Sequence, residues 1–320
     1  GSLKALFEVR DGDNLENFKG KVTKADAYSL TVENTSIDNI KSLNLPDKDG
    51  KITVNNITYS YDSWEAQVDA QGNIKSVTFA LSRDKAIADP DKAVAEGYLL
   101  NAGSAINARG IPYYMTQLNE FVRNFSEMFN QIESKGQNLN GDTPPTFFEA
   151  ITSTAKVYDF SESAAYSKLP DGQTATINSS SNTYYRMTAA NFSVNKDVMN
   201  DVSLFATATD YVKTDSCDIV DELKKLQSEK TVYRGDKAES FLETIISNVS
   251  VDTEKAETYN KLYSNLEQTI ANQRTSVSGV DEDEEALNLV KFQNAYNMAS
   301  KIISVMNQML DKLINDTGVA

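Results

Sequence analysis

The stretch LNLVKFQNAYNMASKIISVMNQMLDKLI, residues 287–314, decides the fold of the end of this chain. Apolar residues recur in it at intervals that alternate between three and four without a slip. This is the heptad spacing of a helix that packs against other helices, and it continues for about four heptads. The positions that we predict to form a partner-binding seam are Leu289, Phe292, Tyr296, Ala299, Ile303, Met306, Leu310 and Leu313.

The residues beside this seam indicate more than one neighbouring helix. The apolar stripe is widened by Val290, Ile302, Val305 and Met309, and the flanking positions are mostly Asn, Gln, Ser and Lys. A two-stranded coiled coil normally carries alternating charges at its flanks, whereas a helix enclosed by several neighbours does not need them. A core helix of a monomeric bundle is the alternative. The length of this helix and its position at the end of the chain favour a role in assembly with other subunits, because monomeric proteins rarely leave such an apolar stripe uncovered.

The acidic run Asp281–Glu285 precedes the heptads and predicts the first turn of this helix. Acidic side chains there are stabilised by the helix dipole, by about 0.3–1 kcal/mol each. A calcium site is the alternative interpretation, but the structural role accounts for the run without a metal. We therefore predict no metal site and no cofactor.

Helical periodicity also appears upstream. Between residues 111 and 135, one face repeats every seven residues, at Ile111, Leu118, Phe125 and Ile132. A helix over 252–276 is predicted to begin at Asp252 or Thr253 as its N-cap. The predicted helices before the C-terminal one cover residues 3–11, 111–135, 217–228, 236–249 and 252–276.

From about Phe18 to Leu81, within the predicted module of residues 12–109, the apolar period changes to two, which predicts strands. Asn55-Asn56 lies between two alternating runs and predicts a tight hairpin. The stretch Asp47–Gly50 resembles the start of a calcium loop, but it lacks the remaining ligands, so we predict a turn. This region is a β-rich module.

Together these patterns predict an α+β fold: a long helical bundle or rod with an inserted β-rich module and a C-terminal coiled-coil-like helix. Clusters of Pro, Gly and Ser predict loops and short strands between residues 140 and 200. The predicted division of the chain is 1–11, the start of the helical core; 12–109, the β-rich outer module; 110–139, a long core helix; 140–200, loops and strands; 201–277, the helical core; and 278–320, the terminal helix.

The residue types that are absent exclude many catalytic sites. The chain has no histidine and one cysteine, Cys217, so a Ser-His-Asp triad, a Cys-His pair and a histidine-bearing zinc site are impossible. A carboxylate pair such as Asp62 and Glu65 is conceivable for glycoside hydrolysis, but among 46 acidic residues this choice is close to arbitrary. We therefore predict no catalytic residues and no enzymatic activity.

Charge and hydropathy limit the partners. The net charge is −15, with 31 basic residues against 46 acidic ones, which disfavours binding to nucleic-acid phosphates. The chain contains no run of about 18 or more apolar residues, so we predict no membrane span.

Three consecutive segments near the C-terminus carry a family resemblance. Ser276–Val280, Asp283–Ala286 and Leu289–Tyr296 together resemble the C-terminal signature of flagellar hook-associated and rod/hook axial proteins. Earlier segments resemble the hook-associated members of that family, namely Leu3–Asp11, Ile111–Asn130 and Met187–Asn195. The resemblance does not extend to residues 12–109, where the family carries variable outer domains.

The resemblance implies a structural subunit of the bacterial flagellum that serves motility as an adaptor at the hook–filament junction. It implies export by the flagellar type III route and an extracellular location. The implied partners are hook protein, hook-associated protein 3, a flagellar export chaperone and further copies of this chain in a ring or tube. Because the family has an N-terminal axial segment that pairs with the C-terminal helix, we expect the chain that starts at Gly1-Ser2 to be a piece of a longer protein.

Two alternatives stay open beside this function. The chain could be another axial protein, such as hook protein or a flagellin-like protein. It could also have an adhesin role, in which exposed tyrosines such as Tyr184 and Tyr185 bind host surfaces. Packing of these two tyrosines at a domain junction is the other interpretation of that pair.

Overall fold

The computed structural model describes residues 2–47, 49–163, 166–212 and 216–317. The chain divides after Ile246 into two compact units. The first unit contains all the strands described below, and the second contains most of the C-terminal helices. The division of the chain into six parts remains a prediction.

The β-rich module is a seven-stranded antiparallel sheet with the strand order β3-β6-β1-β2-β5-β4-β8. An additional pairing between β3 and β4 closes six of these strands into a barrel. The barrel strands are β1 (Phe18–Asp26), β2 (Ser29–Glu33), β3 (Gly50–Val54), β4 (Ile57–Val68), β5 (Ile74–Leu81) and β6 (Leu99–Ala102). The short helix α2 (Pro90–Ala95) packs against β1. The seventh strand, β8 (Ala175–Asn178), pairs with the second half of β4.

Alternation of buried and exposed side chains fills the barrel. In β2, Leu30 and Val32 are buried while their neighbours are half-buried. The largest fully buried side chains of the module are Trp64, Tyr61 and Phe79. Because these aromatic rings occupy the interior, the closed barrel is a packed core and not a channel.

The hairpin predicted at Asn55-Asn56 is confirmed. Val54 pairs with Ile57, and the two asparagines have φ angles of 48° and 61°. A two-residue turn with both φ values positive matches the twist of the flanking strands, and asparagine tolerates this conformation better than most residues. The turn predicted at Asp47–Gly50 includes Lys48, which lies outside the described residues.

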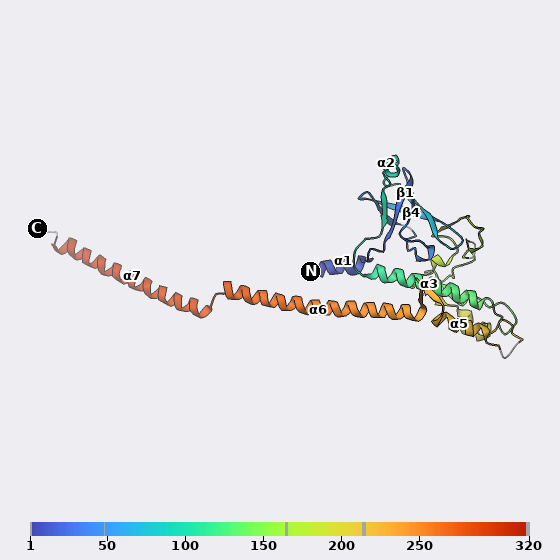
Figure 1. Ribbon diagram of the computed structural model, residues 1–320. Coiled ribbons are helices and arrows are strands. Elements are labelled where there is room, and N and C mark those ends of the chain that lie inside the picture. The colour runs from blue at the N-terminus through green and yellow to red at the C-terminus, as the bar shows by residue number, and fades with distance from the viewer. Residues whose placement is uncertain (1, 48, 164–165, 213–215, 318–320) are drawn as a thin grey trace. The chain divides into compact units, whose positions relative to one another are not determined.

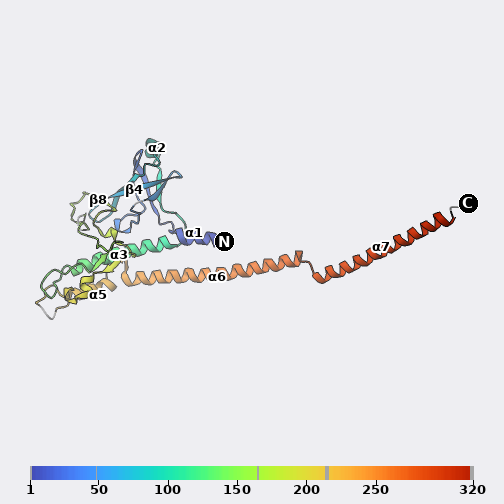
Figure 2. The same cartoon turned by 180° about the vertical axis from the view of Figure 1, so that it is seen from behind.

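The long helix predicted from residue 111 is confirmed as α3 (Ile111–Glu133), and the short N-terminal one as α1 (Ser2–Asp11). In both views α1 and α3 follow one another below the barrel, and α5 (Asp218–Ser228) lies on the far side of α3 (Figures 1 and 2). A small hairpin of β10 (Thr231–Tyr233) and β11 (Asp236–Lys237) leads into α6. The apolar core shared by these elements consists of Phe121, Ile132, Ile219, Leu226, Val232, Tyr233, Ala238 and Phe241.

The segment between α3 and α5 consists of loops and short elements. Its strands β7 (Phe148–Ala150) and β9 (Phe192–Val194) pair antiparallel, and α4 (Lys196–Asn200) follows. The described residues of the first unit include the 3-10 turns η1 (Ile40–Ser42), η2 (Tyr166–Lys168), η3 (Tyr184–Arg186) and η4 (Val202–Leu204). A cluster of ring contacts joins this segment to α3 through Phe125, Phe129, Phe147, Phe148 and Phe192.

Arg123 fastens α3 to the barrel module. Its side chain is 3% exposed, and it donates to the carbonyl oxygens of Met187, Leu43 and Lys41 at 3.0, 2.7 and 3.2 Å. Its guanidinium carbon lies 4.4 Å from the ring centroid of Tyr185. Tyr185 is buried and its hydroxyl donates to the Leu45 carbonyl oxygen at 2.8 Å, so it packs at this junction and is not an exposed binding residue.

Glu133, at the end of α3, is a buried carboxyl group. It is 2% exposed, and its Oε1 accepts a hydrogen bond from the Ala206 amide at 2.7 Å. Burial raises the pKa of Glu133 to about 7, and the Ala206 hydrogen bond opposes this change. Close packing continues at Gly136, where an added Cβ would lie 2.6 Å from the Ala206 Cβ.

The raised pKa of Glu133 predicts a dependence of stability on pH. A carboxyl group with a pKa higher in the folded than in the unfolded state favours folding at low pH, and this contribution is lost as pH rises through 7. Relative to Glu133→Gln, the wild-type free energy of unfolding should fall by about 2 kcal/mol between pH 5 and pH 8.5. Urea denaturation at several pH values measures this difference. Parallel profiles for the two proteins would show that Glu133 ionises normally.

The helices predicted at 236–249 and 252–276 are one continuous helix, α6 (Ala238–Ser278), so the predicted break between them is wrong. The N-cap interpretation of Thr253 fails because its hydroxyl donates to the Val249 carbonyl oxygen at 2.8 Å, a bond typical of a helix interior. No Gly or Pro interrupts the chain there.

The C-terminal helix is α7 (Glu282–Thr317), and the acidic run marks its start as predicted. The Asp281 carboxylate accepts hydrogen bonds from the amides of Asp283 and Glu284 at 3.0 and 3.4 Å. These bonds satisfy amides that a helix N-terminus leaves without partners. Of the helices in the described ranges, none has the length and apolar character needed to cross a membrane.

Candidate functional site

The predicted seam lies along α7 as one exposed face. Its seven large side chains are between 51% and 74% exposed, and Ala299 is exposed as well. Helical geometry alone brings these positions together, because residues three and four apart lie on the same side of a helix. Their role in binding a partner remains a prediction.

A second apolar stripe adjoins the seam. It consists of Met298, Ile302, Val305 and Met309, which are between 44% and 64% exposed. Together with Lys301 and Met306 they line a shallow hollow of about 420 Å³. Three of these residues, Ile302, Val305 and Met309, are predicted from the sequence only as a widening of the seam, and Met298 is not predicted. Their spacing of four, three and four repeats the heptad interval, and this was the signal for a second stripe.

The two stripes define how much of α7 is apolar. At about 100° per residue, the seam and the second stripe together cover an arc of roughly 200°. The remaining arc carries polar side chains such as Ser300, Ser304 and Gln308. An arc of this width exceeds the narrow stripe of a two-stranded coiled coil and is suited to contact with more than one helix.

The second half of α6 has an exposed apolar face too. Tyr259, Leu262, Leu266 and Ile270 recur at intervals of three and four and are all at least half exposed. Tyr263 is 64% exposed, and its ring centroid lies 6.4 Å from that of Tyr259. α6 and α7 thus each present apolar surface.

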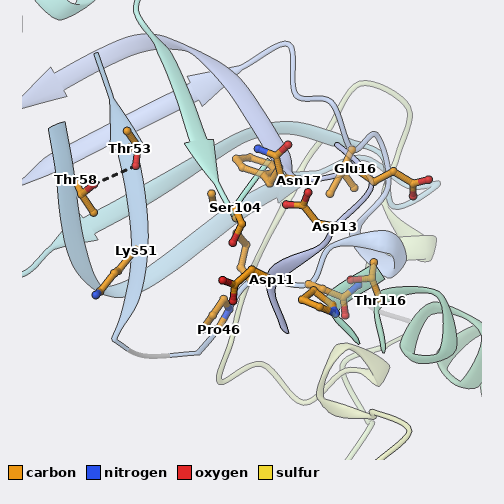
Figure 3. Close-up of a pocket in the computed structure, with 17 residues that line it drawn as sticks. Asp11, Asp13, Glu16, Asn17, Pro46, Lys51, Thr53, Thr58, Ser104 and Thr116 are labelled. Carbon is orange, nitrogen blue, oxygen red and sulfur yellow. Dashed lines mark hydrogen bonds between the residues drawn. The ribbon is translucent and has the colours of Figure 1, made fainter. Parts of the chain in front are cut away.

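A hollow of about 510 Å³ lies in the first unit where the barrel meets α1 and α3. Figure 3 shows Asp11, Asp13 and Glu16 on one side of it and the β3–β4 hairpin residues on another. The Asp13 carboxylate accepts hydrogen bonds from the amides of Leu15, Ala105 and Ile106 at 3.2, 2.8 and 2.9 Å. Asp13 therefore holds two loops together and is not poised for catalysis.

The conceivable carboxylate pair of the sequence analysis lies on the outer surface of the barrel. Asp62 and Glu65 are both exposed, while Trp64 between them is buried. The Asp62 carboxylate accepts a hydrogen bond from the Ser82 hydroxyl. The two carboxylates therefore lie on an open surface, outside the hollow where the barrel meets α1 and α3.

Two comparisons with known proteins bear on the seam. Residues 271–316 match the family described as flagellar basal body rod FlgEFG protein C-terminal, a stretch that contains the whole seam. The chain is also 24% identical to flagellar hook-associated protein 1 of Bacillus subtilis (strain 168) over 215 residues. That similarity covers 65% of this chain and 36% of the relative, so the chain spans little more than a third of that protein's length. The two matches together support a flagellar hook-associated protein within the family of flagellar axial structural proteins.

Proposed function

We propose that this chain is the adaptor subunit at the hook–filament junction of the bacterial flagellum and that it assembles through the seam of α7. The observation that supports this most strongly is the seam itself. Its eight residues share one exposed helix face inside the stretch that matches flagellar rod proteins. The flagellar structural family also points to a non-enzymatic protein.

Burial of the seam would supply the free energy of assembly. Covering one large apolar side chain stabilises a complex by about 1.5–3 kcal/mol. Full burial of seven such side chains would contribute about 10–21 kcal/mol. This equals or exceeds the entropic cost of association over most of its range of about 4–15 kcal/mol. Because the apolar arc of α7 is wide, several helices are needed to cover it. Contacts of this kind between copies, repeated around an axis, build a ring or tube.

The neighbours that we propose are hook protein on one side and hook-associated protein 3 on the other, with further copies of this chain beside it. Before assembly, a flagellar export chaperone covers the same seam. The chain leaves the cell by the flagellar type III route and acts outside it. An exposed apolar stripe of this size needs a cover at every stage, because it would otherwise promote aggregation.

Hydrogen exchange of residues 286–314 tests this proposal. In the isolated chain the amides of α7 should exchange rapidly, since exposed helices open locally at little cost. On incorporation with hook protein and hook-associated protein 3, exchange should slow by about tenfold or more. The purified export chaperone should produce the same protection. Strands β2 and β5 inside the barrel module serve as the control and should not change. Incorporation without protection of α7 would contradict the proposed role of the seam.

A further inference from the structure

A second hollow of the first unit, of about 640 Å³, lies between the C-terminal half of α3, strand β7 and the loop that follows it. Three acidic side chains line it, from Glu127, Glu149 and Asp159, and no Lys or Arg does so in the described part of the chain. Three aromatic side chains, from Tyr158, Phe160 and Tyr184, line the same hollow. Its size is within the range of small-ligand sites, so its chemistry decides what it can bind.

Glu149 is the unusual group of this hollow. It is 6% exposed, and among the described residues its carboxylate accepts no hydrogen bond and forms no ion pair. Burial raises the pKa of Glu149; Asp197 raises it further, and Lys196 lowers it. A buried carboxyl group either takes up a proton or, in its charged form, needs a donor or a cation beside it. This requirement points to a partner that enters the hollow from outside.

The other two acids already have partners. Glu127 forms an ion pair with Lys41, with 2.7 Å between Oε2 and Nζ, and accepts from the Gln131 amide group at 3.3 Å. Asp159 accepts from the Ser161 amide and hydroxyl at 2.9 and 2.7 Å. They keep the hollow negative, but Glu149 is the acid that is left to hold a ligand directly.

The aromatic walls suit a positive charge. Phe160 and Tyr184 stack with 4.4 Å between ring centroids and 14° between ring planes. The ring of Tyr158 already attracts the Arg186 guanidinium, whose carbon lies 4.1 Å from its centroid. Aromatic faces attract cations through the ring quadrupole, and a neutral polar ligand gains no such attraction.

From this arrangement we infer that the hollow binds an organic cation, a primary ammonium or guanidinium group on an alkyl stem, with Glu149 as its counter-ion and its stem against the aromatic lining. Such a group can come from a free polyamine or amino acid, or from a Lys or Arg side chain of another protein. Both sources supply a cationic group that can pair with the Glu149 carboxylate, and both carry an apolar stem that can pack against the aromatic side chains.

Titration of the intact chain with small probes, followed by NMR, tests the inference. Butylammonium and butylguanidinium should bind, whereas 1-butanol, butyrate and methyl glucoside should not. Putrescine, compared with N-acetyl-lysine methylamide and N-acetyl-arginine methylamide, separates a free polyamine from a protein side chain. If the neutral probes bind as well as the cations, or if the cations do not bind, the inference is wrong.

Variants identify the counter-ion. Glu149→Gln keeps the shape of the side chain and removes a buried charge, so it should fold and should weaken cation binding about tenfold or more. Asp84→Asn removes an exposed charge elsewhere on the barrel and should leave binding unchanged. Thermal unfolding monitors the fold of both. Equal binding by the wild type and Glu149→Gln would overturn the role of Glu149.

Discussion

Ile303→Asp is expected to abolish the assembly that we propose for this chain at the hook–filament junction. Ile303 lies in the middle of the seam and is 60% exposed in α7, so the isolated chain should tolerate the change. In an assembled state the carboxylate would be buried among apolar side chains, which costs several kcal/mol even after relaxation. A loss of 4 kcal/mol already lowers an association constant by about a thousandfold. Incorporation at hooks, followed by electron microscopy and by motility, measures the effect.

The matched control for this prediction is the neighbouring residue. Ser304 lies on the polar side of α7, so Ser304→Asp adds the same charge one residue away and should allow assembly. Both variants should show the thermal unfolding of the wild-type barrel. Assembly of Ile303→Asp at the wild-type level would mean that the partners bind another face of α7.

Arg123→Ala is expected to destabilise the first unit by about 3–5 kcal/mol, since it removes a buried charged donor from three carbonyl oxygens. Three carbonyl oxygens would lose their donor, and the Tyr185 ring would lose the cation above it. Urea denaturation followed by the fluorescence of Trp64 inside the barrel measures the loss. Arg83→Ala, at an exposed arginine, is the control and should change stability by less than about 0.5 kcal/mol.

Arg123→Lys should not restore this stability. A lysine presents a single charged nitrogen, whereas the arginine reaches Met187 with one nitrogen and Leu43 with another. If Arg123→Lys or Arg123→Ala unfolds at the wild-type urea concentration, the carbonyl oxygens must find other donors, and the fastening of α3 to the barrel does not depend on Arg123.

Local patterns could be predicted from the sequence, and pairings between distant residues could not. The helix from Ile111 and the Asn55-Asn56 hairpin depend on neighbours within a few residues, and both predictions are confirmed. Closure of the barrel depends on β3 pairing with β6, which brings Ile52 opposite Ala102. Nothing in the alternation of either strand specifies this partner, because many strands share the same period of two.

The same distinction holds for the two candidate sites. The seam on α7 could be predicted because its residues are arranged by the helical repeat alone. The hollow around Glu149 could not, since Glu127, Tyr158 and Tyr184 meet there only through tertiary packing. The continuous helix α6 shows a further limit of prediction from sequence. Threonine is a common N-cap residue, but inside a helix its hydroxyl can also donate to a carbonyl oxygen of the preceding turn, as that of Thr253 does.

The pairing of β8 with β4 limits how freely the barrel could be exchanged between related proteins. The barrel strands lie between residues 18 and 102, but Val68 and Ala66 pair with Ala175 and Ile177, which come after α3 in the chain. A chimaera that transplants only the residues before α3 would leave half of β4 as a bare sheet edge, which favours aggregation. Evolution or design that replaces this module as a cassette must therefore carry two separate segments of the gene together.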